Sequence, residues 1–210
     1  MSLIQIKNLS FRYDNGIENI FDDVSVNLDT NWKLGLIGRN GKGKTTLLQI
    51  LSGKLKYDGI ITKNVAIDYF PFKVDENKLT MEAIQDFCMA EDWEIIKELN
   101  ILNFNIEALY RAYKTLSGGE KVKAMLVALF LKDNNFLLID EPTNHLDPMT
   151  QLIISDTFKN YEGTMLLVSH NLDFVDNLNI NRMLLLPSGR ITYYDRDIVM
   201  HYEMLDEENQ

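Results

Sequence analysis

A glycine-rich segment, residues 38–45, constrains the fold of this chain more than any other feature. It reads Gly-Arg-Asn-Gly-Lys-Gly-Lys-Thr and fits the pattern G-x-x-x-x-G-K-[ST]. An apolar run over 33–37 predicts a short buried strand before it, and the pattern over 44–51 predicts a helix after it. Glycines let successive backbone N–H groups converge on phosphate oxygens, and the start of the helix adds a partial positive charge. The segment therefore predicts a phosphate-binding loop.

This segment, called the phosphate loop below, supplies most of the candidate nucleotide ligands. Lys44 would reach the β- and γ-phosphates, and the Thr45 hydroxyl would face Mg²⁺. Ordinary residue usage gives such a match by chance in about one chain in a hundred of this length. The candidate phosphate-binding residues are Gly38, Asn40, Gly41, Lys42, Gly43, Lys44, Thr45 and Thr46.

A second motif, residues 137–147, reads Leu-Leu-Ile-Asp-Glu-Pro-Thr-Asn-His-Leu-Asp. Its apolar run predicts a buried strand that ends in two adjacent carboxylates, Asp140 and Glu141. The proline and the residues after it turn the chain away, so both carboxylates would face a cleft at the carboxyl end of a sheet. Hydrolysis of a nucleoside triphosphate needs one carboxylate for Mg²⁺ and one to orient the attacking water. The pair is therefore the candidate metal ligand and general base.

Composition narrows the class of protein. With 46% hydrophobic and 25% charged residues, the 210-residue chain can bury a sizeable core. No apolar run approaches the roughly 20 residues that a spanning helix needs, and the N-terminus lacks a secretory signal pattern. The single cysteine, Cys88, excludes an internal disulfide, so we expect a cytoplasmic protein. The formal net charge of −10 argues against a surface built mainly to coat nucleic acid.

The periodicity of apolar residues predicts an α/β fold. Alternation over the first thirty residues predicts an antiparallel β layer, and strands alternating with helices after residue 117 predict a mostly parallel sheet covered on both faces. Between them, residues 80–111 read as helical, with Trp93 as an expected core anchor and Thr80 as an expected helix cap. One α/β core over 1–210 with a helical lobe inserted at about 76–116 is the simplest account.

A third motif, the signature segment Leu116–Glu120, reads Leu-Ser-Gly-Gly-Glu. As local structure it predicts a helix start capped by Ser117, with Glu120 three residues later. That interpretation leaves Gly118 and Gly119 unexplained, whereas an outward-facing helix start is an anion site. Taken in this order, the phosphate loop, the signature segment and the Asp140-Glu141 pair resemble an ATP-binding-cassette (ABC) ATPase over essentially the whole chain.

The resemblance implies a site that two cassettes share. In that family, ATP lies between the phosphate loop of one cassette and the Ser-Gly-Gly signature of the other, which here is Ser117, Gly118 and Gly119. By the same resemblance, Asp140 holds Mg²⁺, Glu141 is the general base and Asp147 lies at the interface between cassettes. The implied cofactors are ATP and Mg²⁺.

Two further residues are assigned by the same resemblance. His170, in Val-Ser-His, would contact the γ-phosphate, although a histidine at such a position is by itself more often a cap or a core residue. Tyr13, in Phe-Arg-Tyr, would stack on adenine, and its alternative is a surface tyrosine at the end of a strand. Phe72 is a departure, because the family normally has a glutamine there that contacts Mg²⁺. An aromatic ring cannot ligate Mg²⁺, so we expect an additional water on the metal and altered coupling.

The residues after the carboxylate pair narrow the branch of the family. Asn144 and His145 stand where membrane transporters typically have Ser-Ala, and they resemble the ABC-F branch. Those proteins join two cassettes by a helical linker and act on the ribosome, in translation control or antibiotic resistance. The chain is similar to an N-terminal cassette of the antibiotic-resistance members, with the linker starting at about 200–210. The expected partners are a second cassette and, through other parts of the protein, the ribosome.

Three alternatives remain from the sequence. The chain could be the ATP-binding subunit of a membrane transporter whose spanning partner is a separate chain, docked near residues 70–74. It could be the head of a chromosome-maintenance ATPase, but those carry a long coiled-coil insertion before the signature segment. It could also bind nucleotide without turnover.

Overall fold

The computed structural model describes residues 3–14, 16–38, 40–132 and 135–207, with side chains described to residue 201. The strands are β1 (Leu3–Phe11), β2 (Phe21–Asp29), β3 (Lys33–Ile37), β4 (Asp58–Lys63), β5 (Ala66–Phe70), β6 (Asn135–Asp140), β7 (Thr164–Val168), β8 (Arg182–Leu185) and β9 (Arg190–Tyr193). The helices are α1 (Lys44–Leu51), α2 (Thr80–Cys88), α3 (Asp92–Ile101), α4 (Gly118–Phe130), α5 (Pro148–Asn160), α6 (Leu172–Asp176) and α7 (Arg196–Glu207), with short 3₁₀ turns η1 (Ile106–Tyr110) and η2 (Tyr113–Thr115). Arg39 of the phosphate loop and residues 208–210 of the predicted linker lie outside the described residues.

Two sheets form the α/β part of the molecule. The smaller is antiparallel, with the order β2-β1-β4, and the larger has the order β5-β6-β7-β3-β8-β9. Neighbouring strands of the larger sheet are parallel except for β9, which runs antiparallel to β8. The predicted fold class, with its antiparallel layer and mostly parallel sheet, is confirmed. Strand β9 and helix α7 are additions that the periodicity of the sequence did not predict.

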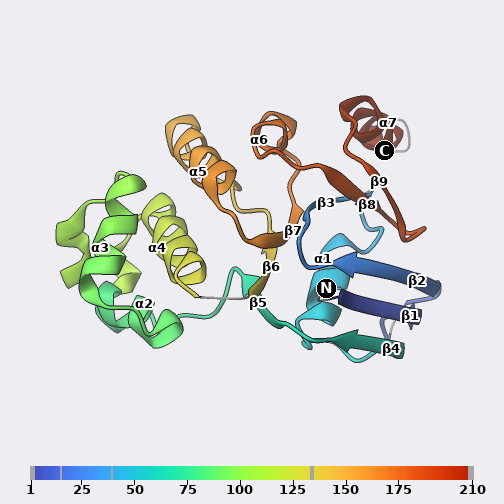
Figure 1. Cartoon of the computed structure of the whole chain (residues 1–210), viewed down its shortest axis with the longest axis horizontal. Helices are drawn as coiled ribbons and strands as arrows, with labels where there is room; N and C mark the ends of the chain where they lie inside the picture. Colours follow the sequence, from blue (N-terminus) through green and yellow to red (C-terminus); the bar gives the residue numbers. More distant parts are fainter. Residues whose placement is uncertain (1–2, 15, 39, 133–134, 208–210) are drawn as a thin grey trace.

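The larger sheet is covered on both faces (Figure 1). Phe136 and Leu138 of β6 pack in one core with residues of α1 and of the antiparallel sheet. The alternate residues Leu137 and Ile139 pack in a second core with side chains from α4, α5 and α6. Because both sets are fully buried, β6 reads as a continuous apolar run and not as an alternation.

The helical lobe lies at the end of the molecule away from the antiparallel sheet (Figure 1). It has a core of its own, built by α2, α3, η1, η2 and α4. The prediction that Trp93 anchors this core is wrong, because its side chain is 65% exposed. Ile95 and Leu99 are fully buried instead. They are four residues apart and share a helix face, whereas Trp93 lies on the opposite side of α3 from Ile95.

The start of α2 also differs from the prediction. Thr80 is the first helical residue, and Leu79 is the residue that precedes the helix. The Leu79 N–H donates to the Glu82 carboxylate at 3.2 Å, while the Thr80 hydroxyl donates to the carbonyl of Arg111 at 3.0 Å. Thr80 therefore ties α2 to the chain after η1 and does not cap the helix. In the described ranges, no helix combines the length and the apolar character that crossing a membrane requires.

Candidate nucleotide-binding and catalytic site

The phosphate loop joins the end of β3 to the start of α1, as its motif requires. Gly41 and Gly43 have φ angles of 75° and 92°, which favour glycine. A Cβ on Gly43 would lie 2.6 Å from the Ile20 side chain and 2.7 Å from the ring of Phe21. Any other residue at 43 would therefore push the loop away from the N-terminal sheet. Glycine lets α1 begin beside that sheet, with its first N–H groups open to an anion.

A cavity of about 370 Å³ opens beside this loop. Its lining gathers the phosphate loop with residues that are distant in sequence: Tyr13, Ile20, Asn40, Gly41, Gly43, Lys44, Thr45, Thr46, Glu141, Asn144, Val168 and His170. We call it the phosphate-loop cavity. A larger cavity, of about 460 Å³, is lined by residues such as Asn64 and Asn135, without a charged side chain among its described residues. An anion is therefore better accommodated at the phosphate loop.

The two lysines of the loop have different surroundings. Lys44 lines the phosphate-loop cavity, and its ammonium group donates to the carbonyl of Gly38 at 2.6 Å. Lys42 lines a neighbouring cavity, together with the carboxylates Glu18 and Asp22. Of the two, Lys44 is the lysine that shares a cavity with Glu141. The two predicted phosphate ligands thus separate in space.

Asp140 ends β6 and is held by two hydroxyl groups. The Thr45 hydroxyl donates to Oδ1 at 3.3 Å, and the Tyr69 hydroxyl donates to Oδ2 at 2.7 Å. Burial, followed by the hydrogen bond to Asp140, raises the pKa of Tyr69, so the phenol stays protonated and is the donor. Asp140 and Thr45 offer the hard oxygen ligands that Mg²⁺ prefers, and the predicted metal residues are adjacent.

Glu141 is mostly buried and lies in the left-handed backbone region, with a φ of 48°. Its own N–H donates to the carbonyl of Val168 at 3.0 Å, which fixes this backbone between two strand ends. The backbone N–H of His170 donates to one carboxylate oxygen at 3.3 Å, and the His170 Nε2 lies 3.3 Å from the other. Burial raises the pKa of Glu141, and the charge and N–H of His170 oppose part of that change. A carboxylate with a raised pKa beside a histidine is suited to accept a proton.

Tyr13 is one of the residues that line the phosphate-loop cavity. Its hydroxyl is 3.0 Å from the Thr46 hydroxyl, and its ring meets the Phe11 ring edge-on at 4.9 Å between centroids. The side chain remains 45% exposed. The contacts to Thr46 and Phe11 hold the Tyr13 ring in place and leave part of its surface open near the phosphate loop. Such a surface suits stacking on a base.

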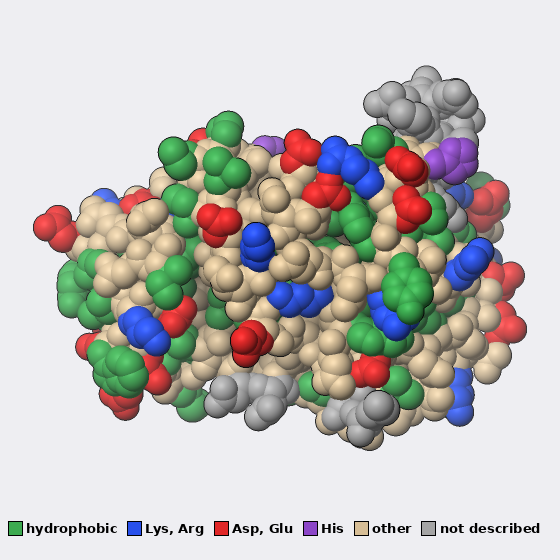
Figure 2. All heavy atoms as spheres, turned by 45° about the horizontal axis from the view of Figure 1, so that its top comes forward, with side chains coloured by type: hydrophobic (Ala, Val, Ile, Leu, Met, Phe, Trp, Pro, Cys, Tyr) green, Lys and Arg blue, Asp and Glu red, His purple; other side chains and the backbone are tan. Residues whose placement is uncertain are grey.

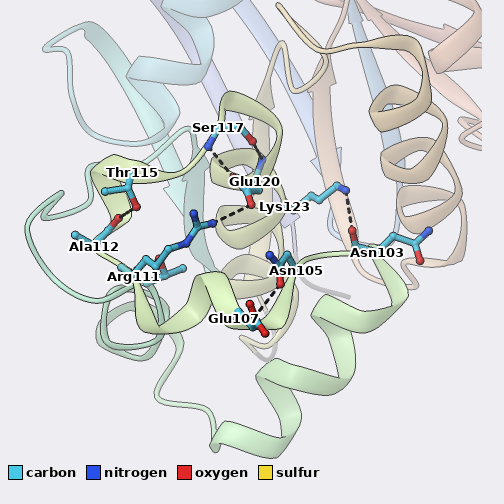
Figure 3. A network of polar contacts seen from close by, with 10 residues as sticks. Asn103, Asn105, Glu107, Arg111, Ala112, Thr115, Ser117, Glu120 and Lys123 are labelled. Carbon is cyan, nitrogen blue, oxygen red and sulfur yellow. Dashed lines mark hydrogen bonds and ion pairs between the residues drawn. The ribbon is translucent and has the colours of Figure 1, made fainter.

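The signature segment starts α4 and stands apart from this cavity. Ser117 caps the helix, with its hydroxyl accepting the Glu120 N–H at 3.3 Å and its own N–H donating to the Glu120 carboxylate at 2.8 Å. Arg111 holds the other Glu120 oxygen at 3.4 Å, which fixes the cap (Figure 3). Among the described residues, none approaches within 4 Å of a Cβ added to Gly118, so this helix start faces open space. Within one chain, Ser117, Gly118 and Gly119 do not join the described lining of the phosphate-loop cavity.

Asp147 is another predicted site residue outside that described lining. It caps α5, and its two carboxylate oxygens accept from the Thr150 N–H at 3.0 Å and the Thr150 hydroxyl at 2.6 Å. These bonds lower the pKa of Asp147. A Cβ on Gly119 would lie 3.3 Å from the Thr150 methyl group, so the cap of α5 and the signature segment are neighbours. Asp147 is exposed, and its partner Thr150 is the residue that lies beside Gly119.

Phe72 packs against the helical lobe. Its ring stacks on Phe87 of α2, with centroids 3.8 Å apart and an interplanar angle of 12°. It packs between the cores of the lobe and the sheet, and it is not among the described residues that line the phosphate-loop cavity. The absence of Phe72 from that described lining agrees with leaving it out of the candidate site, and the expected additional water on the metal stays a prediction. Stacking on Phe87 turns the ring toward the lobe.

Sequence reasoning missed Tyr69 and Asn144 as members of the site. Tyr69 reaches Asp140 from the neighbouring strand, a relation that only the register of β5 and β6 reveals. Asn144 lines the phosphate-loop cavity because the turn after Glu141 brings it back, with its N–H 3.3 Å from the Glu141 carbonyl. Its position three residues after Glu141 was a usable signal for such a turn.

Comparison with known proteins identifies the family. A model of the ABC transporter family matches residues 21–144, more than half of the chain. The chain is 31% identical to ABC transporter F family member 2 of Arabidopsis thaliana over 207 residues, which cover 93% of this chain and 30% of that protein. It is 29% identical to the energy-dependent translational throttle protein EttA of Haemophilus influenzae, over 92% of this chain and 36% of that protein.

A solved structure agrees with the fold. The ATP-binding cassette MJ0796, solved as a dimer in a post-hydrolysis state with ADP and Pi, superposes with a TM-score of 0.76 at 18% identity, covering 90% of this chain and 98% of that one. The chain spans about a third of the length of the two curated relatives. The family match and these relatives show that the chain belongs to the ABC transporter family, as an ATP-binding cassette of its F branch.

Proposed function

We propose that this cassette binds ATP with Mg²⁺ and hydrolyses it to ADP and phosphate. The observation that carries the proposal is the phosphate-loop cavity, where α1 begins beside Asp140, Glu141 and His170. Lys44 and the loop N–H groups would bind the phosphates, and Thr45 and Asp140 would hold Mg²⁺, whose charge would offset the negative charge that develops on the phosphate oxygens. Glu141 takes the proton of the attacking water, His170 contacts the γ-phosphate and Tyr13 stacks on adenine. The remaining loop residues supply backbone contacts.

Full activity requires a second cassette in this proposal. The start of the signature segment faces open space at Gly118 and lies outside the described lining of the phosphate-loop cavity, which supports its use by a nucleotide held on another cassette. A dimeric cassette of the same fold supports this arrangement. Gly118, Gly119, Ser117 and Asp147 would then lie at the interface. The partner is a second cassette of the same polypeptide or a head-to-tail copy of this chain.

Complementation between two inactive variants tests the shared site. Lys44→Ala removes the phosphate-binding lysine, and Gly118→Asp places a negative charge where the partner's phosphates would lie. A Cβ at 118 has open space, and an acidic residue in the first turn favours a helix, so Gly118→Asp should fold normally. Each variant alone should show little ATPase activity. Their equimolar mixture should regain about a quarter of the wild-type rate, because half of the dimers pair unlike chains and each has one intact site.

The matched control is Gly53→Asp, also at an open glycine but after α1, although its φ of 77° adds local strain. Gly53→Asp alone should hydrolyse ATP. Mixed with Lys44→Ala, it should give no more activity than the same amount of Gly53→Asp gives alone. A mixture of Lys44→Ala and Gly118→Asp that stays inactive at concentrations where wild type is active would refute the shared site.

We further propose that the whole protein is a cytoplasmic two-cassette ABC-F protein that acts on the ribosome, in translation control or antibiotic resistance. Asn144-His145 and the name of the EttA relative as a translational throttle support this assignment. In that protein, residues 1–210 would form the N-terminal cassette, with the lobe at about 76–116 and the linker starting at about 200–210. On the face shown in Figure 2, basic side chains lie among acidic ones, so we assign most of the ribosome contact to the linker and other parts.

Co-sedimentation of the two-cassette parent with ribosomes tests this assignment. With ATP and Glu141→Gln in the cassette, which traps the ATP-bound state, the protein should pellet with ribosomes. With ADP it should remain in the supernatant, because only bound ATP would hold the cassettes together. Equal pelleting with both nucleotides would argue for non-specific contact, and recovery with membranes instead of ribosomes would favour the transporter subunit.

A further inference from the structure

Tyr69 and Asp140 lie on neighbouring parallel strands and on one face of the sheet. The register pairs Tyr69 with Leu138, and Asp140 follows Leu138 by two residues, so its side chain leaves the strand on the same face. The Tyr69 ring points along that face toward the carboxyl edge, and its hydroxyl donates to Oδ2 of Asp140 at 2.7 Å. Thr45 donates to the other oxygen at 3.3 Å. The two donors fix the plane of the carboxylate and direct Oδ1 to the phosphate loop.

Lys54 secures the Tyr69 ring. Its ammonium group lies 3.5 Å from the ring centroid, in the geometry of a cation–π contact. The Lys54 backbone N–H donates to the carbonyl of Gln49 at 2.8 Å, which anchors the residue to the end of α1. Two routes therefore connect α1 to Asp140. Thr45, in the first turn of the helix, contacts Asp140 directly, and Lys54, three residues after the helix ends, supports the Tyr69 ring that contacts Asp140. A shift of the phosphate loop and a shift of the carboxylate are thereby linked.

We propose that Tyr69 is a positioning residue for the metal-binding carboxylate of Asp140, with Lys54 as the support of its ring. The inference rests on the proposed function, since it takes Asp140 to be a Mg²⁺ ligand. A carboxylate that binds a metal is commonly oriented by a hydrogen bond from outside the metal's own ligands, and losing that bond lowers metal affinity or activity. Phe72 stacks on Phe87, whereas Tyr69, near the end of β5, reaches this site with its hydroxyl group.

Tyr69→Phe tests the role because it removes the hydroxyl and keeps the ring under Lys54. The whole 210-residue chain is loaded with a fluorescent, non-hydrolysable ATP analogue, and Mg²⁺ is titrated into it. The half-saturating Mg²⁺ concentration should rise about 10- to 100-fold relative to wild type. Nucleotide affinity measured in EDTA should stay within about twofold, because the phosphate loop is intact. Lys54→Met also removes a positive charge that acts on Asp140, so it is compared with Lys73→Met, which removes a neighbouring charge and leaves Lys54 over the ring. The half-saturating Mg²⁺ concentration should be higher in Lys54→Met than in Lys73→Met.

Tyr113→Phe is the matched control. It loses a tyrosine hydroxyl that donates to the carbonyl of Lys121 at 3.2 Å, in the helical lobe. Its Mg²⁺ titration should follow wild type, and thermal melting should show that each variant is folded. If Tyr69→Phe does not fold, the comparison of Lys54→Met with Lys73→Met decides.

The outcomes separate this inference from the proposed function. The positioning role alone is overturned if nucleotide binding by the wild-type chain depends on Mg²⁺ and Tyr69→Phe has the same half-saturating Mg²⁺ concentration. A wild-type chain that binds no nucleotide, or binds it with no influence of Mg²⁺, overturns the proposed function and the positioning role with it. The inference is also overturned if Tyr69→Phe lowers the nucleotide affinity measured in EDTA by the same factor as the Mg²⁺ affinity, since that would show general damage to the site.

Discussion

Replacing Glu141 by glutamine should lower the rate of ATP hydrolysis about 100- to 10,000-fold and should leave ATP binding in place. Glutamine has the shape of glutamate and keeps an oxygen that can accept the backbone N–H of His170. It cannot accept the proton of the attacking water. The negative charge beside the γ-phosphate is also removed, so ATP affinity should be unchanged or higher. The separation of turnover from binding is the mark of a general base.

Steady-state phosphate release and equilibrium binding of a fluorescent ATP analogue measure the two effects. Both measurements are made at protein concentrations above which the wild-type turnover rate no longer rises, so that pairing of cassettes does not limit the rate. Glu107→Gln is the matched control, because Glu107 is an exposed residue of η1 in the lobe. It should behave as wild type in both assays. A Glu141→Gln chain that retains more than about a tenth of the wild-type rate would mean that another group activates the water.

The residues predicted from motifs are those whose chemistry is local to one segment. The phosphate loop carries its own evidence, because glycines with positive φ and the start of α1 lie within a few residues of Lys44. The prediction of Asp140 and Glu141 rests, in the same way, on one segment: the end of a buried strand. Helix α4 and its cap at Ser117 were predicted for the same reason: cap, glycines and glutamate are consecutive.

The features that sequence reasoning missed depend on pairing between segments. Tyr69 joins the site because β5 pairs with β6 in one register, and a shift by one residue would turn its ring to the other face. The size of Trp93 suggested a core position, but the position of Ile95 and Leu99 on α3 decides which face is buried. The direction of the Phe72 ring depends on the place of α2. These relations exist only after the elements have packed.

Replacing Lys44 by alanine should lower the affinity for ATP, and Lys42→Ala should leave it nearly unchanged. Both variants remove one positive charge from the same loop, so the comparison isolates position. Lys44 lines the phosphate-loop cavity, whereas Lys42 lies in the neighbouring cavity with Glu18 and Asp22. Hydrogen bonds to charged groups contribute about 1.5–3 kcal/mol each, which corresponds to roughly 10- to 150-fold in affinity. Isothermal titration with Mg²⁺ and a non-hydrolysable ATP analogue measures both variants, and equal losses would mean that net charge, and not the direction of Lys44, binds the phosphates.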